Sequence, residues 1–211
     1  IFLIVDAAQT IGYIDIDVKK MNIDLLAFPG HKSLFGLQGT GGLYISDNID
    51  IPSLKEGGTG SNSDSFIQPN FLPDKFESGT LNTPGIIGLN EGVKFILSNG
   101  LSNIRHHETE LMVYLTNELQ SLSFVKLYGE TNPLLKTPVL SFNIDNRDSS
   151  EVGQYLNSLN IYVRTSYHCA PLIHKIIGTE GIGTVRVSPG YFNNFNDIES
   201  FIVAIRNLYN K

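Results

Sequence analysis

The order of apolar and polar residues divides the chain into two blocks. In the first block, three short apolar runs lie at residues 1–5, 24–28 and 41–45, and a turn or short helix is expected at 15–22. Continuous runs of this length are typical of strands that are buried on both faces of a parallel sheet. We therefore expect an α/β layer with a mostly parallel sheet in this block.

A long polar segment and two helices follow. Residues 52–84 lack a periodic pattern, and a loop of this length in a compact domain usually has a function or faces a partner. Thr83 before Pro84 predicts a helix start with Thr83 as the N-cap. After a break at Asn99-Gly100, apolar residues recur at helical spacing over 101–122. The expected apolar face of this second helix consists of Ile104, Leu111, Leu115 and Leu119.

From residue 124 the pattern changes to that of a small α+β domain. Strands are expected at 124–127, 139–144, 161–163 and 183–187, and helices at 148–159 and 196–208. The first of these helices opens with Asp148 and Glu151, which favour a helix start. We therefore expect two domains, at residues 1–98 and 99–211.

The first apolar run raises the question of what lies beside it. The sequence has no initiator Met, and residues 1–5 are already strand-like. A strand buried on both faces needs neighbouring strands in its sheet. We therefore interpret the chain as the C-terminal part of a longer protein, and a trimmed N-terminus is the alternative.

Composition narrows the classes of protein to which the chain can belong. Of 211 residues, 41% are hydrophobic and 17% are charged, which favours a packed core over disorder. The net charge of −6 and the lack of a dense Lys/Arg block argue against a nucleic-acid-binding surface. No apolar run approaches the roughly 20 residues of a membrane span, so no membrane partner is expected. The single cysteine, Cys169, permits no intramolecular disulfide, which fits a cytoplasmic protein.

Two polar residues lie where the first two expected strands end. Asp6 follows the first strand, and Lys32 lies in Gly30-His31-Lys32 after the second. Ligands bind at the carboxyl ends of strands in open α/β sheets. A carboxylate that holds a protonated pyridine nitrogen and a lysine that forms a Schiff base are the protein half of a pyridoxal-phosphate site. Either residue alone is more commonly a solvated loop residue, but the pair predicts such a site.

A second group of candidate residues lies near the single cysteine. Cys169 follows His168 in a polar loop that also contains Arg164, and this electropositive setting favours a thiolate. The alternative is a small buried hydrophobe. Arg186 interrupts an apolar strand, either as a clamp for a carboxylate or as an edge residue facing water. His168, Cys169 and His174 lack a CxxC-type pair, so no metal site is expected.

Two glycine-rich turns, at 57–61 and at Gly79-Thr80, complete the set of candidates. Their backbone N–H groups and hydroxyls could bind a phosphate, or the glycines could serve loop flexibility alone. The chain has no Walker lysine pattern and no G-x-G-x-x-G after a strand. Nucleotide binding is therefore not expected.

Taken together, these residues resemble the class V aminotransferase family of pyridoxal-phosphate enzymes, and within it the cysteine desulfurases and selenocysteine lyases. The matching stretches are Asp6 to Gln9, Gly30 to Lys32, Phe76 to Pro84, Arg164 with His168 to Ala170, and Arg186 to Ser188. They run from one end of the chain to the other but cover only about the C-terminal half of such an enzyme. The resemblance implies a fold type I remnant: part of the large cofactor-binding domain, with loop 52–84 facing a second subunit, and a small C-terminal domain.

The resemblance implies a role for each residue of the cofactor site. Asp6 would pair with the pyridine nitrogen of pyridoxal 5'-phosphate, and Gln9 would hydrogen-bond the ring's phenolic oxygen. Lys32 would form the Schiff base and then move the Cα proton of the substrate, while His31 would contact the phosphate. Gly79-Thr80 would reach the phosphate of the other subunit's cofactor, which implies a homodimer.

The resemblance also implies a substrate site. Arg186, helped by Arg164 and with His168 beside them, would bind the α-carboxylate of L-cysteine or a similar small amino acid. Cys169 would attack the substrate sulfur, keep it as a persulfide and pass it to an acceptor protein, and alanine would be released. The alternatives are a class V transaminase, a selenocysteine lyase, or a non-catalytic truncated partner that acts as a scaffold.

Two residues depart from the family's pattern. Pro29 stands where the family usually carries a Ser or Thr that contacts the phosphate, and Leu37 stands where it usually carries Pro. The residues that stack on the cofactor ring belong to the half of the enzyme that this chain does not contain. The isolated chain is therefore expected to bind the cofactor weakly and to be inactive alone.

Overall fold

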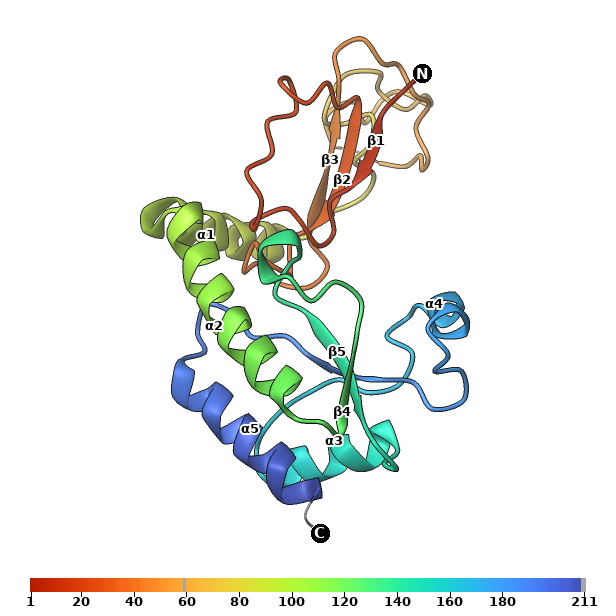
Figure 1. Ribbon diagram of the computed structural model, residues 1–211. Helices are drawn as coiled ribbons and strands as arrows, with labels where there is room; N and C mark the ends of the chain where they lie inside the picture. Colours follow the sequence, from red (N-terminus) through yellow and green to blue (C-terminus); the bar gives the residue numbers. More distant parts are fainter. Residues whose placement is uncertain (59, 210–211) are drawn as a thin grey trace. The chain divides into compact units, whose positions relative to one another are not determined.

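The computed structural model describes residues 1–58 and 60–209 (Figure 1). The chain divides into two compact units, Ile1–Leu101 and Ser102–Lys211, whereas we expected the division after residue 98. Thr59, in the glycine-rich turn at 57–61, lies outside the described residues. Each unit combines a sheet with helical structure, and the α/β class expected from the sequence is confirmed.

The first unit has a three-stranded sheet in the order β1-β2-β3. The strands are β1 (Ile4–Asp6), β2 (Leu25–Pro29) and β3 (Gly41–Ile45). β1 pairs with β2 in parallel, as expected, but β2 pairs with β3 antiparallel. The connection from β2 to β3 is a short loop without a helix, and so it can only return the chain in the opposite direction. The expectation of a mostly parallel sheet is therefore wrong for this pair.

The first strand is shorter and more exposed than its sequence predicts. It begins at Ile4 rather than at residue 1, and Ile4 is 68% exposed. Ala7, Ile23 and Leu26 form the small core of this unit. Burial on both faces requires a layer on each face of the sheet. The described residues leave the apolar start of the chain uncovered, so the expected burial is wrong for this chain.

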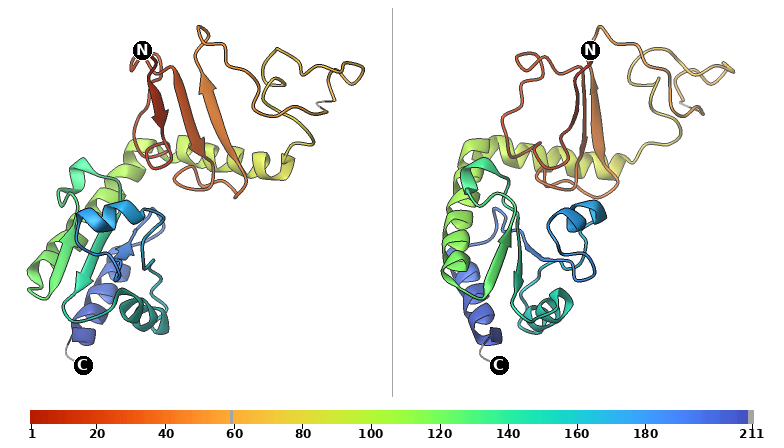
Figure 2. Two further views of the ribbon diagram at one scale, coloured as in Figure 1. Left: turned by 90° about the vertical axis from the view of Figure 1, so that its right-hand side faces the viewer. Right: turned by 45° about the vertical axis from the view of Figure 1, so that its right-hand side comes forward.

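Helix α1 (Thr83–Asn99) belongs to the first unit and runs past one end of its sheet in both views of Figure 2. The side chain of Asn82 accepts a hydrogen bond from the N–H of Gly85, at 3.1 Å. The N-cap is therefore Asn82 and not Thr83 as expected, and Pro84 lies in the first turn. Asn caps a helix as well as Thr does, so the sequence pattern alone does not decide which of these two adjacent residues is the N-cap.

The second unit is an α+β domain, as expected. Its elements are α2 (Leu101–Ser121), β4 (Val125–Tyr128), a 3-10 turn (Pro133–Leu135), β5 (Leu140–Ile144), α3 (Ser149–Ser158), α4 (Pro171–Ile176), β6 (Val185–Val187) and α5 (Phe195–Tyr209). The sheet β4-β5-β6 is antiparallel throughout. Asp148 caps α3 by accepting a hydrogen bond from the N–H of Ser150, which confirms the predicted helix start.

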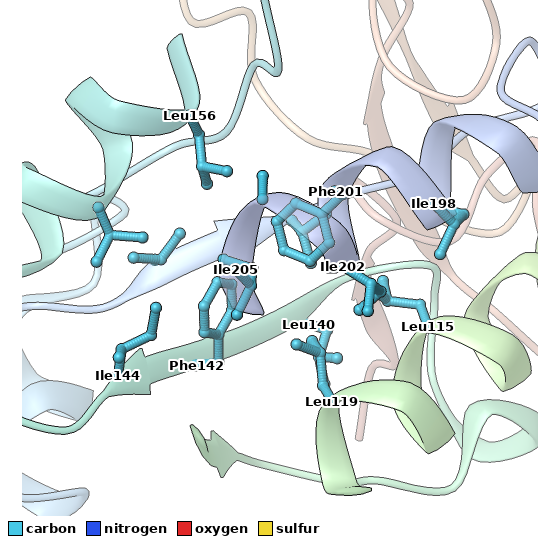
Figure 3. Close-up of a cluster of buried hydrophobic side chains, with 14 of the residues drawn as sticks. Leu115, Leu119, Leu140, Phe142, Ile144, Leu156, Ile198, Phe201, Ile202 and Ile205 are labelled. Carbon is cyan, nitrogen blue, oxygen red and sulfur yellow. The ribbon is translucent and has the colours of Figure 1, made fainter. Parts of the chain in front are cut away.

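One hydrophobic core holds the second unit together. Phe142 of β5 meets Phe201 of α5 edge to face, with ring centroids 5.9 Å apart. Leu115 and Leu119 of α2 are fully buried beside them (Figure 3). The helical spacing of these leucines predicted this face of α2. Because β5 and β6 are anchored in this core, they form a firm support for the polar residues on β6.

The strand expected at 161–163 does not form. Residues 161–163 are not part of a strand, and only Arg164 makes an isolated antiparallel bridge, with Arg186 of β6. Arg164 donates its N–H to the carbonyl of Arg186 at 3.0 Å and accepts the N–H of Arg186 at 2.7 Å. This bridge joins the start of the cysteine loop to β6.

Candidate functional site

The loop that carries Lys32 is closed on itself. β2 ends at Pro29, and the N–H of Gly30 donates to the carbonyl of Thr40 at 2.8 Å. Within the loop, the N–H of Gly36 donates to the carbonyl of Gly30 at 2.8 Å. These bonds fix the backbone on both sides of Lys32, whose side chain is exposed. The backbone of Lys32 is therefore held at a defined place, and its exposed side chain is open to a ligand.

Helix α1 packs against the back of this loop. A Cβ at Gly92 would overlap the carbonyl oxygen of Leu34, so only glycine permits this approach. The rings of Phe35 and Phe95 meet edge to face at 5.4 Å. The lysine loop is therefore clamped between its own hydrogen bonds and α1.

Asp6 lies at the carboxyl end of β1, beside β2. It is in register with Ala27, and its Oδ1 accepts the N–H of Ala8 at 2.9 Å. In the loop after Asp6, Gly12 has a φ of +78°, and a Cβ there would lie 2.5 Å from the carbonyl oxygen of Ser33. The loop that follows Asp6 thus touches the lysine loop at the residue after Lys32. The structure brings the two loops together at one sheet edge, as the strand-end argument predicts.

The other residues expected to bind the cofactor lie in the same unit. Gln9 and His31 are exposed on the two loops that follow β1 and β2. Gly79 and Thr80 are also exposed, and the N–H of Gly79 donates to the carbonyl of Gly58 at 2.7 Å. Their contacts with a cofactor stay predictions.

The donor set at this edge fits pyridoxal phosphate. Asp6 is an exposed carboxylate suited to a protonated ring nitrogen, and Lys32 is an exposed primary amine suited to an aldehyde carbon. Pro29, one of the departures from the family pattern, is the last residue of β2 and pairs with Gly41 of β3. The departure at Pro29 therefore lies in the last residue of β2, and the hydrogen bonds that close the lysine loop form after it.

Cys169 is exposed, which contradicts the alternative of a buried hydrophobe. In the sequence it lies between α3 and α4, on the loop that begins at Arg164. A guanidinium N–H of Arg164 lies 3.0 Å from its Sγ. A cationic donor at this distance is suited to a thiolate, the nucleophilic form of cysteine. Cys169 also has a φ of +64°, which is uncommon for a residue other than glycine.

Arg186 is half-buried in β6, with the cysteine loop along its edge. Burial, and secondarily the charge of Arg164, lowers the pKa of Arg186 below its ordinary value. Its buried Nε has no hydrogen-bond partner among residues 1–58 and 60–209. A donor of this kind beside a second cation is suited to an anion such as a carboxylate. The alternative of an arginine that simply faces water does not agree with this burial.

His168 is held inside the unit. Its Nε2 lies 3.0 Å from the carbonyl oxygen of Thr184 and 2.9 Å from the Thr184 hydroxyl. Burial, followed by the charge of Arg186, lowers the pKa of His168 from its ordinary value of 6.5. The structure thus brings Arg164, His168, Cys169 and Arg186 together near β6, and their contacts with a substrate stay predictions.

Sequence reasoning missed the residues that support the cysteine loop. The hydroxyl of Tyr167 accepts the N–H of Gly181 at 2.7 Å, and the buried His174 contacts the hydroxyl of Thr179 at 2.7 Å through its Nδ1. Thr184 binds His168. The density of Gly and Thr at 178–184 is a signal for a tight turn, but it does not reveal what the turn binds.

Over residues 1–58 and 60–209, no three His, Cys, Asp or Glu side chains are grouped so that they could hold a metal ion. Among the helices in the described part of the chain, none has the length and apolar character of a bilayer span.

Comparisons with known proteins agree on one family. The family model of class-V aminotransferases matches residues 1–201. A protein of Methanothermobacter thermautotrophicus named "Probable cysteine desulfurase" is 36% identical over 93% of this chain and 50% of its own length. An Escherichia coli protein named "Cysteine desulfurase" is 30% identical over 98% of this chain and 51% of its own length. The chain spans about half the length of the curated relatives it matches.

Solved structures show the same fold. The apo structure of a cysteine desulfurase from Thermococcus onnurineus NA1 matches with a TM-score of 0.85 and 33% identity, over 98% of this chain and 52% of that one. The cysteine desulfurase CsdA from Escherichia coli, in an S-sulfonic acid form, matches with a TM-score of 0.86 over 99% of this chain and 52% of that one. The identity to CsdA is 24%, so this second likeness supports the fold alone.

Proposed function

The chain belongs to the class-V aminotransferase family, and from this premise we propose that the whole protein is a pyridoxal 5'-phosphate-dependent cysteine desulfurase. It would convert L-cysteine to L-alanine and receive the sulfur on Cys169. The observation that carries the proposal is the exposed Cys169 thiol, which lies 3.0 Å from Arg164 on a loop bridged to the strand of Arg186. A nucleophile beside an anion-binding arginine is what sulfur removal from an amino acid requires.

The proposed cofactor would be held by the first unit. Asp6 would keep a proton on the ring nitrogen, Gln9 would bind the phenolic oxygen, and His31 would bind the phosphate. Lys32 would attach the cofactor through its amine. When bound, the cofactor supplies an electron sink for charge that develops at the substrate Cα and Cβ.

Lys32 would also move protons. Its amine would take the proton from the substrate Cα. The hydrogen bonds that close the loop at Gly30 and Gly36 keep its backbone in place during this transfer. A proton-transfer group must first lie within reach of the proton, and its pKa matters only once that geometry is met.

Arg186 would bind the substrate α-carboxylate. Its buried Nε is unpartnered in the described chain, and Arg164 adds a second positive charge. A bidentate arginine–carboxylate pair fixes the orientation of the amino acid. The substrate sulfur would then be presented toward Cys169.

Cys169 would complete the sulfur transfer. Its thiolate attacks the substrate sulfur, a sulfur–sulfur bond forms, and the bond between that sulfur and Cβ breaks. The electron pair of the broken bond stays on the substrate, which takes up protons and leaves as alanine. The sulfur stays on Cys169 as a persulfide, and the exposure of Cys169 lets a sulfur-acceptor protein reach it.

We extend the proposal to assembly and location. Gly79 and Thr80 lie in the exposed segment between β3 and α1, and they would bind the cofactor phosphate of a second subunit in a cytoplasmic homodimer. This arrangement follows from the family resemblance and from the exposure of the segment.

A selenocysteine lyase is the second candidate, because sulfur and selenium substrates fit the same residues. The exposed Cys169 beside Arg164 favours either of these over a transaminase, which needs no nucleophilic thiol. A scaffold without catalysis would need neither Lys32 nor Cys169.

The test is a product analysis of the full-length protein. Supplied with L-cysteine and a reductant, it should release equal amounts of alanine and sulfide, and L-selenocysteine should be compared at the same concentration. Transfer of the amino group to an added keto acid without sulfide would show a transaminase instead. Absence of any product together with absence of a bound cofactor would favour the scaffold.

A further inference from the structure

The loop that presents Cys169 is strained and yet well braced. Ser166, His168 and Cys169 all have positive φ values, of 80°, 51° and 64°. Residues other than glycine avoid this region, so each of the three positions is strained unless its surroundings enforce the conformation. Some contact must therefore hold the loop in this conformation.

The bracing contacts come from the segment just before and within β6. The N–H of Thr184 donates to the carbonyl of Ser166 at 3.1 Å, and within the loop the N–H of Ala170 donates to the carbonyl of Tyr167 at 2.8 Å. The Nε2 of His168 meets both the carbonyl and the hydroxyl of Thr184. The side chain of His168, the residue next to Cys169, thus connects the cysteine loop with Thr184, which directly precedes β6.

We infer that His168 is a positioning residue for the proposed reaction: as a neutral imidazole it fastens the cysteine loop to Thr184 and so keeps Cys169 beside Arg164. This inference rests on the proposed function for its consequence in catalysis. The contact between His168 and Thr184 itself does not depend on that function.

The hydrogen bonds define the protonation state of the ring. A carbonyl oxygen can only accept, so the Nε2 of His168 must carry the hydrogen that it shares between the two oxygens of Thr184. Its Nδ1 is buried and has no hydrogen-bond partner in the described part of the chain. A proton on Nδ1 would be a buried donor without an acceptor, which is costly.

The charges around His168 act in the same direction. Arg186 on β6 and Arg164 at the start of the loop are both positive, and the ring of His174 on α4 lies 6.1 Å away. Together with burial, which is the largest cause, they lower the pKa of His168 from 6.5. When the loop opens, these constraints end and the ring protonates more readily. Acid below pH 6.5 should therefore favour the open loop.

The first experiment measures hydrogen exchange at the backbone amides of Ala170 and Thr184 in the full-length protein. We expect His168→Ala to raise the exchange rates of these two amides by about tenfold, because the hydrogen bond between the neutral His168 ring and Thr184 is lost. His168→Gln places an amide N–H where Nε2 lies and should retain most of the protection. His106→Gln is the matched control, since His106 is an exposed histidine on α2 that pairs with Glu110.

The second experiment repeats the exchange measurement between about pH 7.5 and about pH 5, corrected for the intrinsic pH dependence of exchange. Protection of Thr184 should fall on the acid side of this range in the wild type and in His106→Gln. It should stay level in His168→Gln, which cannot titrate and yet leaves His174 in place. A histidine that merely filled space would leave the profiles of wild type and His168→Gln parallel.

A third measurement connects the contact to catalysis. In single turnovers with L-cysteine, His168→Ala should slow sulfur transfer to Cys169 about tenfold while the visible absorbance of the bound cofactor is retained, and His168→Gln should recover most of the rate. Unchanged exchange in His168→Ala, or no rescue by His168→Gln, would overturn the inference. If exchange changes as expected but no sulfur is transferred even by the wild type, the proposed function has failed and the positioning of Cys169 stands.

Discussion

Glu108 offers a quantitative test of the second unit. It lies on α2, is only 7% exposed, and accepts a hydrogen bond from the backbone N–H of Tyr191. Burial raises its pKa from an ordinary 4.5 to about 7, although the Tyr191 N–H and the charge of His107 oppose the rise. The folded protein therefore holds this proton more tightly than the unfolded one. Its stability must fall as the pH rises from 4.5 to about 7.

The magnitude follows from the difference between the two pKa values. At about 1.36 kcal/mol per pH unit, the charged form of Glu108 costs roughly 3 kcal/mol of folding free energy above pH 7. Glu108→Gln removes the charge and keeps an oxygen that can accept from Tyr191. We expect the variant to be more stable than the wild type by up to roughly 3 kcal/mol at about pH 8, and by less than about 1 kcal/mol at about pH 5.

Urea unfolding of the full-length protein at both pH values provides the assay. Glu110→Gln is the control, because Glu110 is exposed on the same helix, and it should change stability by less than about 0.5 kcal/mol at either pH. An equal effect of Glu108→Gln at both pH values, or a loss of stability at about pH 8, would refute the reasoning.

Three further substitutions test the first unit. Lys32→Ala should abolish both the visible absorbance of the bound cofactor and turnover, as measured by spectroscopy and by alanine release; an unchanged spectrum would reject the assignment. Asp6→Ala should leave the cofactor attached but reduce turnover by several orders of magnitude, because the ring nitrogen loses its proton partner; near-normal rates would point to another carboxylate. Gly92→Ala should force α1 away from the carbonyl of Leu34, cost about 1–3 kcal/mol in urea unfolding and weaken cofactor binding, whereas Gly58→Ala, in open space, should be nearly neutral.

Much of the fold could be read from local patterns. The buried leucines of α2 recur at helical spacing, and Asp148 caps α3 where its sequence predicted. These features depend on residues close together in the chain. Local chemistry is sufficient for them.

The errors come from features that depend on distant partners. The run at 161–163 is rich in β-formers, but a strand requires a paired neighbour, and only Arg164 finds one. The apolar residues at 1–4 indicate a buried strand, yet burial depends on layers that the described chain does not place over them. The reversal between β2 and β3 depends on the path of the lysine loop, which no periodicity reveals.

The candidate site also has features that the sequence could predict and features that it could not. Asp6 and Lys32 were predictable because parallel strands bring their carboxyl ends together whatever the loops do. The contact between His168 and Thr184 was not, since it joins residues 16 positions apart across a loop with three positive φ values. Sequence propensity disfavours such a backbone, and contacts with residues distant in the chain, such as Thr184 and Gly181, stabilise it.

The central claim is that Cys169 receives sulfur from the substrate. The most direct measurement is mass spectrometry of the peptide that contains Cys169, after the full-length protein has reacted with L-cysteine and without reductant. The account predicts one added sulfur atom on Cys169 in the wild type. It also predicts that Cys169→Ser retains the visible absorbance of the bound cofactor and gains no sulfur, because a hydroxyl is a poor nucleophile at neutral pH. Alanine release by Cys169→Ser at the wild-type rate, or an unmodified Cys169 in an active wild type, would contradict it.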